Sequence, residues 1–165
     1  MTARPVSRAA LRSRMRFLAV VEAFNVGWLA LMLFGAARVP PSAANVVGYG
    51  LVALLVSQGA WYWAAKDRQL RDRARAPAGL GAFRVLRWVN PCLLGAGLAV
   101  IGPAAWQQPG ARSLPGLAFL AFAVVEHVNY FHLQLQHDTR ADLRRLARTR
   151  RLHPSHLAID LRRHR

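Results

Sequence analysis

The sequence predicts an all-α membrane protein: an antiparallel bundle of four transmembrane helices, with both termini in the cytoplasm and a basic cytoplasmic C-terminal tail. Three observations lead to this fold class. Four apolar runs are each long enough to cross a bilayer, the basic residues gather on one side of those runs, and two of the three connections are short. Of the 165 residues, 54% are hydrophobic although the net charge is +16, so the charges must lie between the apolar runs.

The apolar runs set the number and type of the spans. A hydrocarbon core about 30 Å thick needs about 20 helical residues, and each run is close to that length. Backbone polar groups must be hydrogen-bonded within lipid, which favours helices over isolated strands. The predicted spans are residues 17–37, 45–65, 88–106 and 114–135, so that residues 1–137 form the transmembrane domain and residues 138–165 the basic tail.

The basic residues set the orientation. Five Arg precede the first span, seven basic residues lie between the second and third spans, and nine Arg follow the fourth. The first and third connections hold only Arg38 and Arg112, and both are short and contain proline, as in loops that join antiparallel neighbours. Because positive charge marks the cytoplasmic side, both termini are predicted to lie inside.

A cleaved signal peptide is the alternative interpretation of the first span. The apolar region of such a signal is usually about 7–15 residues long, whereas this run is longer and contains Glu22 and Asn25. Cleavage would leave three spans without changing the orientation of the others. We therefore keep four spans as the prediction.

Composition indicates the source and compartment. Of the 23 basic residues all but Lys66 are Arg, which is typical of a high-GC bacterial genome, so the bacterial cytoplasmic membrane is the expected location. The single cysteine, Cys92, can form no intramolecular disulfide, which excludes dithiol oxidoreductases.

Polar residues within the spans are the candidates for function. The chain has only two glutamates, Glu22 and Glu126, and both fall inside predicted spans, where ionisable groups are costly and usually functional. At 1.5 Å per helical residue they lie about 9 Å and about 16 Å from the cytoplasmic boundary. Every span adds a polar residue, mostly in the cytoplasmic half. The candidates are Glu22, Asn25, Gln58, Asn90, Glu126, His127, Asn129, Tyr130 and His132.

These residues predict a polar site that opens to the cytoplasm and binds or moves a small polar species or a proton. Glu126 is the expected charged element and Glu22 its partner or gate. At 100° per residue, Glu126 shares a helix face with Tyr130, whereas His132 points elsewhere. The structural alternative is that the same side chains only pair across helices, at about 0.6 kcal/mol each.

No metal or cofactor is expected. A zinc protease needs His-Glu-x-x-His and a di-iron bundle needs Glu-x-x-His, but the third residue after Glu126 is Asn129. The segment from Gly48 to Gly50 resembles a dinucleotide or potassium-filter pattern only superficially. It lies inside a span, and the connection before it is too short for the pore helix that a filter needs.

The tail and loops suggest partners. The lipid bilayer surrounds the spans, and anionic headgroups are the expected partners of the basic loops and tail. Within the tail, Leu143 and Leu146 recur at helical spacing, and a break at Pro154 precedes a short predicted helix with Leu157 and Leu161. Nucleic acid is not expected, because the tail lacks a recognisable fold or interleaved aromatics. Stripes of small residues leave open a homo-oligomer or a membrane-protein partner.

Two other functions stay open from sequence. A non-catalytic accessory or scaffold protein would use the polar residues to assemble helices and the basic tail to recruit a partner or lipid. A lipid-modifying enzyme would use Glu126 or His127 as a general base, but the chain supplies no evident nucleophile.

Overall fold

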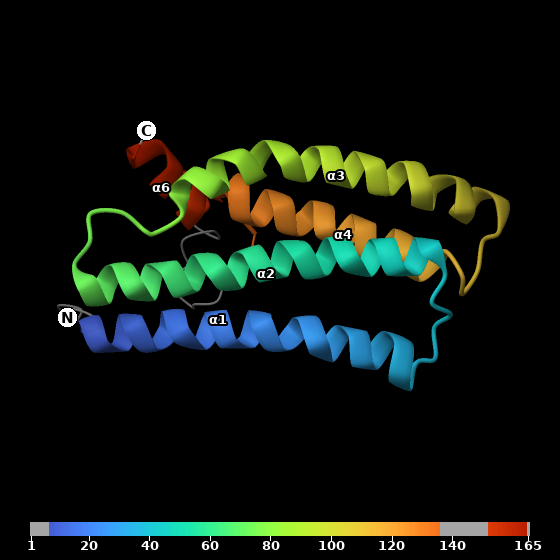
Figure 1. Cartoon of the computed structure of the whole chain (residues 1–165), viewed down its shortest axis with the longest axis horizontal. Helices are drawn as coiled ribbons and strands as arrows, with labels where there is room; N and C mark the ends of the chain where they lie inside the picture. Colours follow the sequence, from blue (N-terminus) through green and yellow to red (C-terminus); the bar gives the residue numbers. More distant parts are fainter. Residues whose placement is uncertain (1–6, 136–151, 165) are drawn as a thin grey trace.

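The computed structural model describes residues 7–135 and 152–164, and within them the chain is almost entirely helical (Figure 1). Four long helices lie side by side and alternate in direction. The elements are α1 (Arg8–Ala30), η1 (Leu31–Ala36), α2 (Ala43–Asp72), α3 (Leu80–Gln107), α4 (Leu114–Phe131), β1 (Leu133–Gln134), β2 (His153–Pro154) and α6 (His156–Arg163). All four long helices, α1 together with η1, are long and apolar enough to cross a membrane. The prediction of an all-α chain with four candidate spans is confirmed.

Three helices extend beyond the predicted spans at one end of the bundle. There α1 begins at Arg8, α2 continues to Asp72 and α3 begins at Leu80. We call this the basic end. The extensions are charged, and since Arg and Lys are good helix formers, charge does not end a helix. Ser7 caps α1, where its side chain accepts a hydrogen bond from the amide of Ala10.

Two helix ends depart from a simple α-helix. The last turn of the first span is the π-helix η1, after which Arg38 takes a left-handed backbone conformation with φ 49°. The fourth helix ends at Phe131, not at residue 135, because the chain turns into β1 and the Asn129 side chain accepts a hydrogen bond from the amide of Leu135 at 2.9 Å.

Helix α2 is central and packs against the other three long helices. It meets α4 through backbone contact at the end of the bundle opposite the basic end. A Cβ on Gly48 would lie 2.4 Å from the carbonyl oxygen of Gly116, and a Cβ on Gly116 would lie 2.3 Å from that of Ala44. The segment from Gly48 to Gly50 is therefore continuous helix at a close helix crossing.

Asn45 fixes this crossing. Its side chain is buried, accepts a hydrogen bond from the amide of Gly116 at 2.8 Å, and donates to the carbonyls of Pro40 at 2.9 Å and Ala111 at 2.8 Å. One amide side chain thus links the connection before α2 and the connection before α4 to the contact between these two helices.

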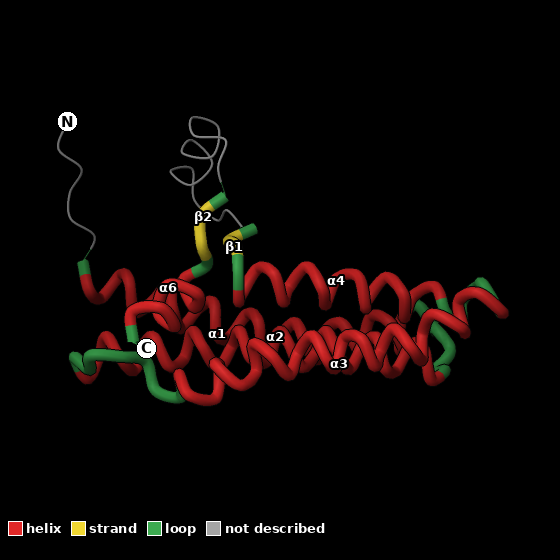
Figure 2. The backbone as a smooth tube through the Cα atoms, turned by 90° about the horizontal axis from the view of Figure 1, so that it is seen from above, coloured by secondary structure: helices red, strands yellow, loops and turns green. Residues whose placement is uncertain are grey.

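The short helix α6 folds back onto the basic end of the bundle (Figure 2). The predicted break and helix are confirmed: Ser155 caps α6 by accepting from the amide of Ala158. Leu157 and Leu161 are buried in a cluster with Tyr62, Phe83 and other bundle residues. The apolar face of α6 is thus covered by the protein itself. Leu143 and Leu146 lie outside the described residues.

Candidate functional site

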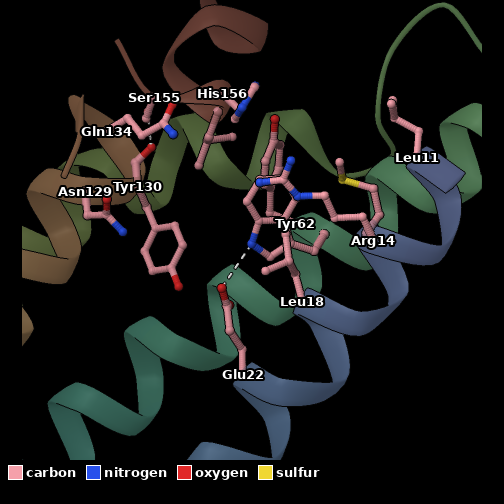
Figure 3. A pocket seen from close by; sticks show the side chains of 13 residues that line it. Leu11, Arg14, Leu18, Glu22, Tyr62, Asn129, Tyr130, Gln134, Ser155 and His156 are labelled. Carbon is pink, nitrogen blue, oxygen red and sulfur yellow. Dashed lines mark hydrogen bonds between the residues drawn. The ribbon is translucent and has the colours of Figure 1, made fainter. Parts of the chain in front are cut away.

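A cavity of about 330 Å³ lies at the basic end, between α1, α2, the end of α4 and α6 (Figure 3). Its walls combine apolar side chains of α1 with aromatic and polar groups from the other elements. The lining residues are Leu11, Arg14, Met15, Leu18, Glu22, Tyr62, Trp63, Asn129, Tyr130, Gln134, Ser155, His156 and Leu157.

Glu22 is the carboxylate of this cavity. It comes from α1 and accepts a hydrogen bond from the indole N–H of Trp63, on α2, at 3.0 Å. The phenol of Tyr130, on α4, points toward the same carboxylate (Figure 3). Gly59 makes room for both groups, because a Cβ there would lie 2.2 Å from Glu22 Oε2 and 2.3 Å from the Tyr130 hydroxyl.

Both glutamates of the chain lie near Tyr130. Both act electrostatically on its phenol, but they occupy different surroundings. Glu126 is buried, does not line the cavity, and accepts a hydrogen bond from the side chain of Asn129 at 3.4 Å. The sequence-based hypothesis made Glu126 the charged element and Glu22 its partner, whereas Glu22 is the one that faces the cavity.

Helix α6 forms one wall, and a buried carboxylate holds it. Asp160 accepts hydrogen bonds from the hydroxyl of Tyr62 at 2.7 Å and from the ammonium group of Lys66 at 3.0 Å. Next to it, the Ser155 hydroxyl donates to the backbone carbonyl of Tyr130, and the Ser155 amide donates to that of His132 at 3.2 Å. Contacts of α6 and Ser155 with α2 and with the end of α4 therefore hold one wall of the cavity in place.

His156 lies on α6 against Trp63, with the ring centroids 5.9 Å apart and the rings edge to face. Burial lowers the pKa of His156 below its ordinary value. The nearby charges of Lys66 and Arg14, together with His153, lower this pKa further, and Asp160 opposes them. The docked imidazole is thus held in its neutral form.

This pKa shift predicts acid sensitivity of the α6 contact. A depressed folded-state pKa stabilises docking above the unfolded value of about 6.5, and the contribution is lost as the pH falls through the folded value. We expect the thermal midpoint (Tm) of the wild type to fall more between about pH 7.5 and about pH 5.5 than that of His156→Phe, which keeps the aromatic contact without titrating. Equal pH responses in differential scanning fluorimetry would contradict this.

Some predicted site residues lie elsewhere. Gln58 and Asn90 are buried and pair with each other through two hydrogen bonds of 3.1 and 2.8 Å, which link α2 to α3. Asn25 is half-buried on α1 and does not line the cavity. The rings of His127 and His132 lie edge to face with centroids 5.4 Å apart, and neither residue lines the cavity. Of the nine candidates, the cavity brings together Glu22, Asn129 and Tyr130.

Four residues of the site were not predicted as such from the sequence. Trp63 has the position of an interfacial aromatic, and only the structure shows that its N–H donates to Glu22. Tyr62 and Gly59 lie in an apolar run, and nothing in the sequence pattern distinguishes them as site residues. Asp160 is the one carboxylate of α6, and an acidic residue in a strongly basic tail was the available hint.

No family model, no curated protein and no solved structure matches this chain. Within residues 7–135 and 152–164, no group of three or more His, Cys, Asp or Glu side chains is placed to hold a metal ion. The cavity and its carboxylate, Glu22, are therefore the features that point to a function.

Proposed function

We propose that this chain is a small multi-pass protein of the bacterial cytoplasmic membrane that binds or moves a small polar species or a proton at the cavity lined by Glu22. The main observation behind the proposal is the position of the Glu22 carboxylate in the structure. Glu22 belongs to a run whose other residues are apolar apart from Asn25, yet it faces a cavity of about 330 Å³ together with Trp63 and Tyr130. An ionisable group at such a position is costly for a membrane helix, which is why it usually marks function.

The position of the cavity supports access from the cytoplasm. It lies at the basic end of the bundle, where α1 starts and α2 ends among Arg and Lys residues. Under the positive-inside rule this end faces the cytoplasm. The same rule gives the proposed orientation, with both termini inside.

The arrangement around Tyr130 supports proton transfer in particular. Glu22 faces the cavity, Glu126 lies buried, and the charges of both act on the Tyr130 phenol. A hydroxyl can donate one hydrogen bond and accept another, so it can connect two carboxyl groups in a proton path. We propose Glu22 as the entry and Tyr130 as the link toward Glu126.

The test is proton uptake by proteoliposomes that contain the full chain and an internal pH dye, under an imposed membrane potential. We expect uptake in the wild type and a loss of at least about ten-fold, a free-energy difference of about 1.4 kcal/mol, in Glu22→Gln. Asp72→Asn is the matched control, because it neutralises an exposed carboxylate at the same end. Binding of small polar compounds, followed by thermal shift, is measured on the same variants.

A second variant tests the shape of the site without changing its charge. Gly59→Ala keeps every charge but places a methyl group where the Glu22 carboxylate and the Tyr130 hydroxyl lie. We expect it to impair uptake, while Gly50→Ala, whose Cβ meets open space, leaves uptake unchanged. Wild-type uptake and binding in both Glu22→Gln and Gly59→Ala would refute the proposed function.

A scaffold role is the second candidate, and the outer face of α1 favours it. Helix α1 has no buried residue and packs mainly against α2. Its large exposed side chains recur at spacings of three and four, as in a helix that has a further partner. From residue 17 onward they are Phe17, Val20, Phe24 and Trp28, and Leu31 of η1 continues the series. Under this candidate, Glu22→Gln lowers Tm by several degrees and no variant, including the wild type, shows uptake or binding.

A further inference from the structure

We propose that the seam between α3 and α4 binds an anionic phospholipid, with an acyl chain in an apolar groove and the phosphate on Arg87 and His132. This site is separate from the Glu22 cavity, and it shares none of the lining residues of that cavity.

The groove is the part of the proposed site in which the acyl chain lies. It is an apolar hollow of about 360 Å³ on the surface of the bundle, with no polar lining. Gly95 widens it, because a Cβ at that position would meet nothing within 4 Å. A hydrocarbon chain suits such a surface. The groove is lined by Leu94, Gly95, Leu98, Leu117, Leu120, Ala121 and Val124.

Toward the basic end the same seam becomes basic. Arg87 precedes Leu94 by seven residues and His127 follows Leu120 by seven, and residues seven apart lie on the same helix face. Seven helical residues span about 10.5 Å. Arg87 and His127 thus lie about two helical turns from the groove. A phospholipid can place its acyl chain in the groove and its headgroup at these polar side chains.

The groups at this position are basic and incompletely satisfied. Within the described part of the chain, Arg87 Nε and His127 Nδ1 are buried without a hydrogen-bond partner, and His127 as a whole is only 6% exposed. His132 lies beside it, with ring centroids 5.4 Å apart, and its own side chain is exposed. Arg87 is the permanently charged group that acts on His127, and His132 is the neighbouring titratable one.

The depth of this cluster fits a headgroup. Trp88 is 73% exposed on the same turn, and the Arg87 guanidinium lies 5.7 Å from its ring centroid. Exposed tryptophans in membrane proteins mark the level of the headgroups. A guanidinium at that level binds phosphate oxygens through two parallel N–H groups, and an Arg near an anionic surface strengthens binding to it. Groove, charge and depth together favour an anionic phospholipid as the occupant.

Native mass spectrometry of the full chain tests this proposal, after release from nanodiscs that contain equal amounts of phosphatidylglycerol and phosphatidylcholine. We expect the wild type to retain phosphatidylglycerol about five- to ten-fold over phosphatidylcholine. Arg87→Gln should remove this preference and Arg87→Lys should keep part of it. Arg71→Gln removes the same charge from an exposed pair at the same end and should change nothing.

A separate variant tests the groove. Gly95→Leu fills the hollow without altering any charge, and we expect it to reduce retained lipid of both kinds. Unchanged retention in Arg87→Gln, or an equal loss in Arg71→Gln, would overturn the proposal. So would displacement of the lipid by inorganic phosphate alone with no effect of Gly95→Leu, since that result would identify a site for a free anion. None of these results depends on the function of the Glu22 cavity.

Discussion

Replacing Gly48 or Gly116 with alanine is expected to lower the free energy of unfolding by about 3 kcal/mol, the upper part of the range for an overpacked interior. The added methyl group of Gly48→Ala would meet the backbone of Gly116, and that of Gly116→Ala would meet the backbone of Ala44. Backbone atoms of a helix cannot move aside singly, so α2 and α4 must separate along the crossing. The hydrogen bonds of Asn45 to Gly116 and Ala111 would lengthen with them.

Gly50→Ala is the matched control. It lies on the same helix two residues away, and its Cβ would meet nothing within 4 Å. Alanine is the better helix former by about 1 kcal/mol, so this variant should be as stable as the wild type or more so. In a chain of this length, about 3 kcal/mol lowers Tm by about 6–12 °C, which scanning fluorimetry in nanodiscs detects. A Tm in Gly48→Ala equal to that of Gly50→Ala would show that the α2–α4 crossing is looser than described.

Asp160→Asn is expected to release α6 from the bundle. The substitution keeps the shape of the side chain but removes the charge that Lys66 pairs with and weakens the bond from Tyr62. A hydrogen bond to a charged group contributes about 1.5–3 kcal/mol. Taking about 2 kcal/mol, the docked state loses about thirty-fold in population relative to the undocked state. Because Ser155, His156 and Leu157 line the cavity, its wall opens with α6.

Hydrogen exchange read by mass spectrometry measures this release at the amides of α6. They should exchange about thirty-fold faster in Asp160→Asn, while those in the middle of α2 and α4 keep their protection. Asp72→Asn is the control, since its pair with Arg71 is exposed and about half accessible on both sides; exposed pairs contribute little. Equal α6 protection in Asp160→Asn and the wild type would mean that Leu157 and Leu161 hold the helix without the carboxylate.

The four helices were predictable because the runs of apolar residues are long and the charges between them are dense. The starts of α1 at Arg8 and of α3 at Leu80 were not. Arg12 and Asp67 form a salt bridge of 3.0 Å between α1 and α2, in a region that the apolar runs alone leave outside the spans. Hydropathy reports what lipid tolerates, whereas the helix continues for as long as backbone propensity and neighbouring helices allow.

The sequence indicated several residues of the site, but it did not indicate how they are arranged in space. A rare carboxylate in an apolar run identified Glu22, and the polar stretch of the fourth span identified Asn129 and Tyr130. Which side chains would meet depends on which helices are neighbours and on their rotation, and one sequence does not specify either. Gln58 and Asn90 show this limit, because the same reasoning placed them in the site although they satisfy each other between α2 and α3.

The wall that α6 supplies has a consequence for biogenesis. Glu22 and Trp63 leave the ribosome long before Ser155, and translation proceeds at about 5–20 residues per second. For several seconds the four long helices therefore leave this side of the cavity open, and it is covered only when α6 folds onto them. A reporter domain fused behind α6 can leave the four long helices intact and still keep α6 from covering the cavity, so such a fusion should be compared with the chain that lacks the reporter.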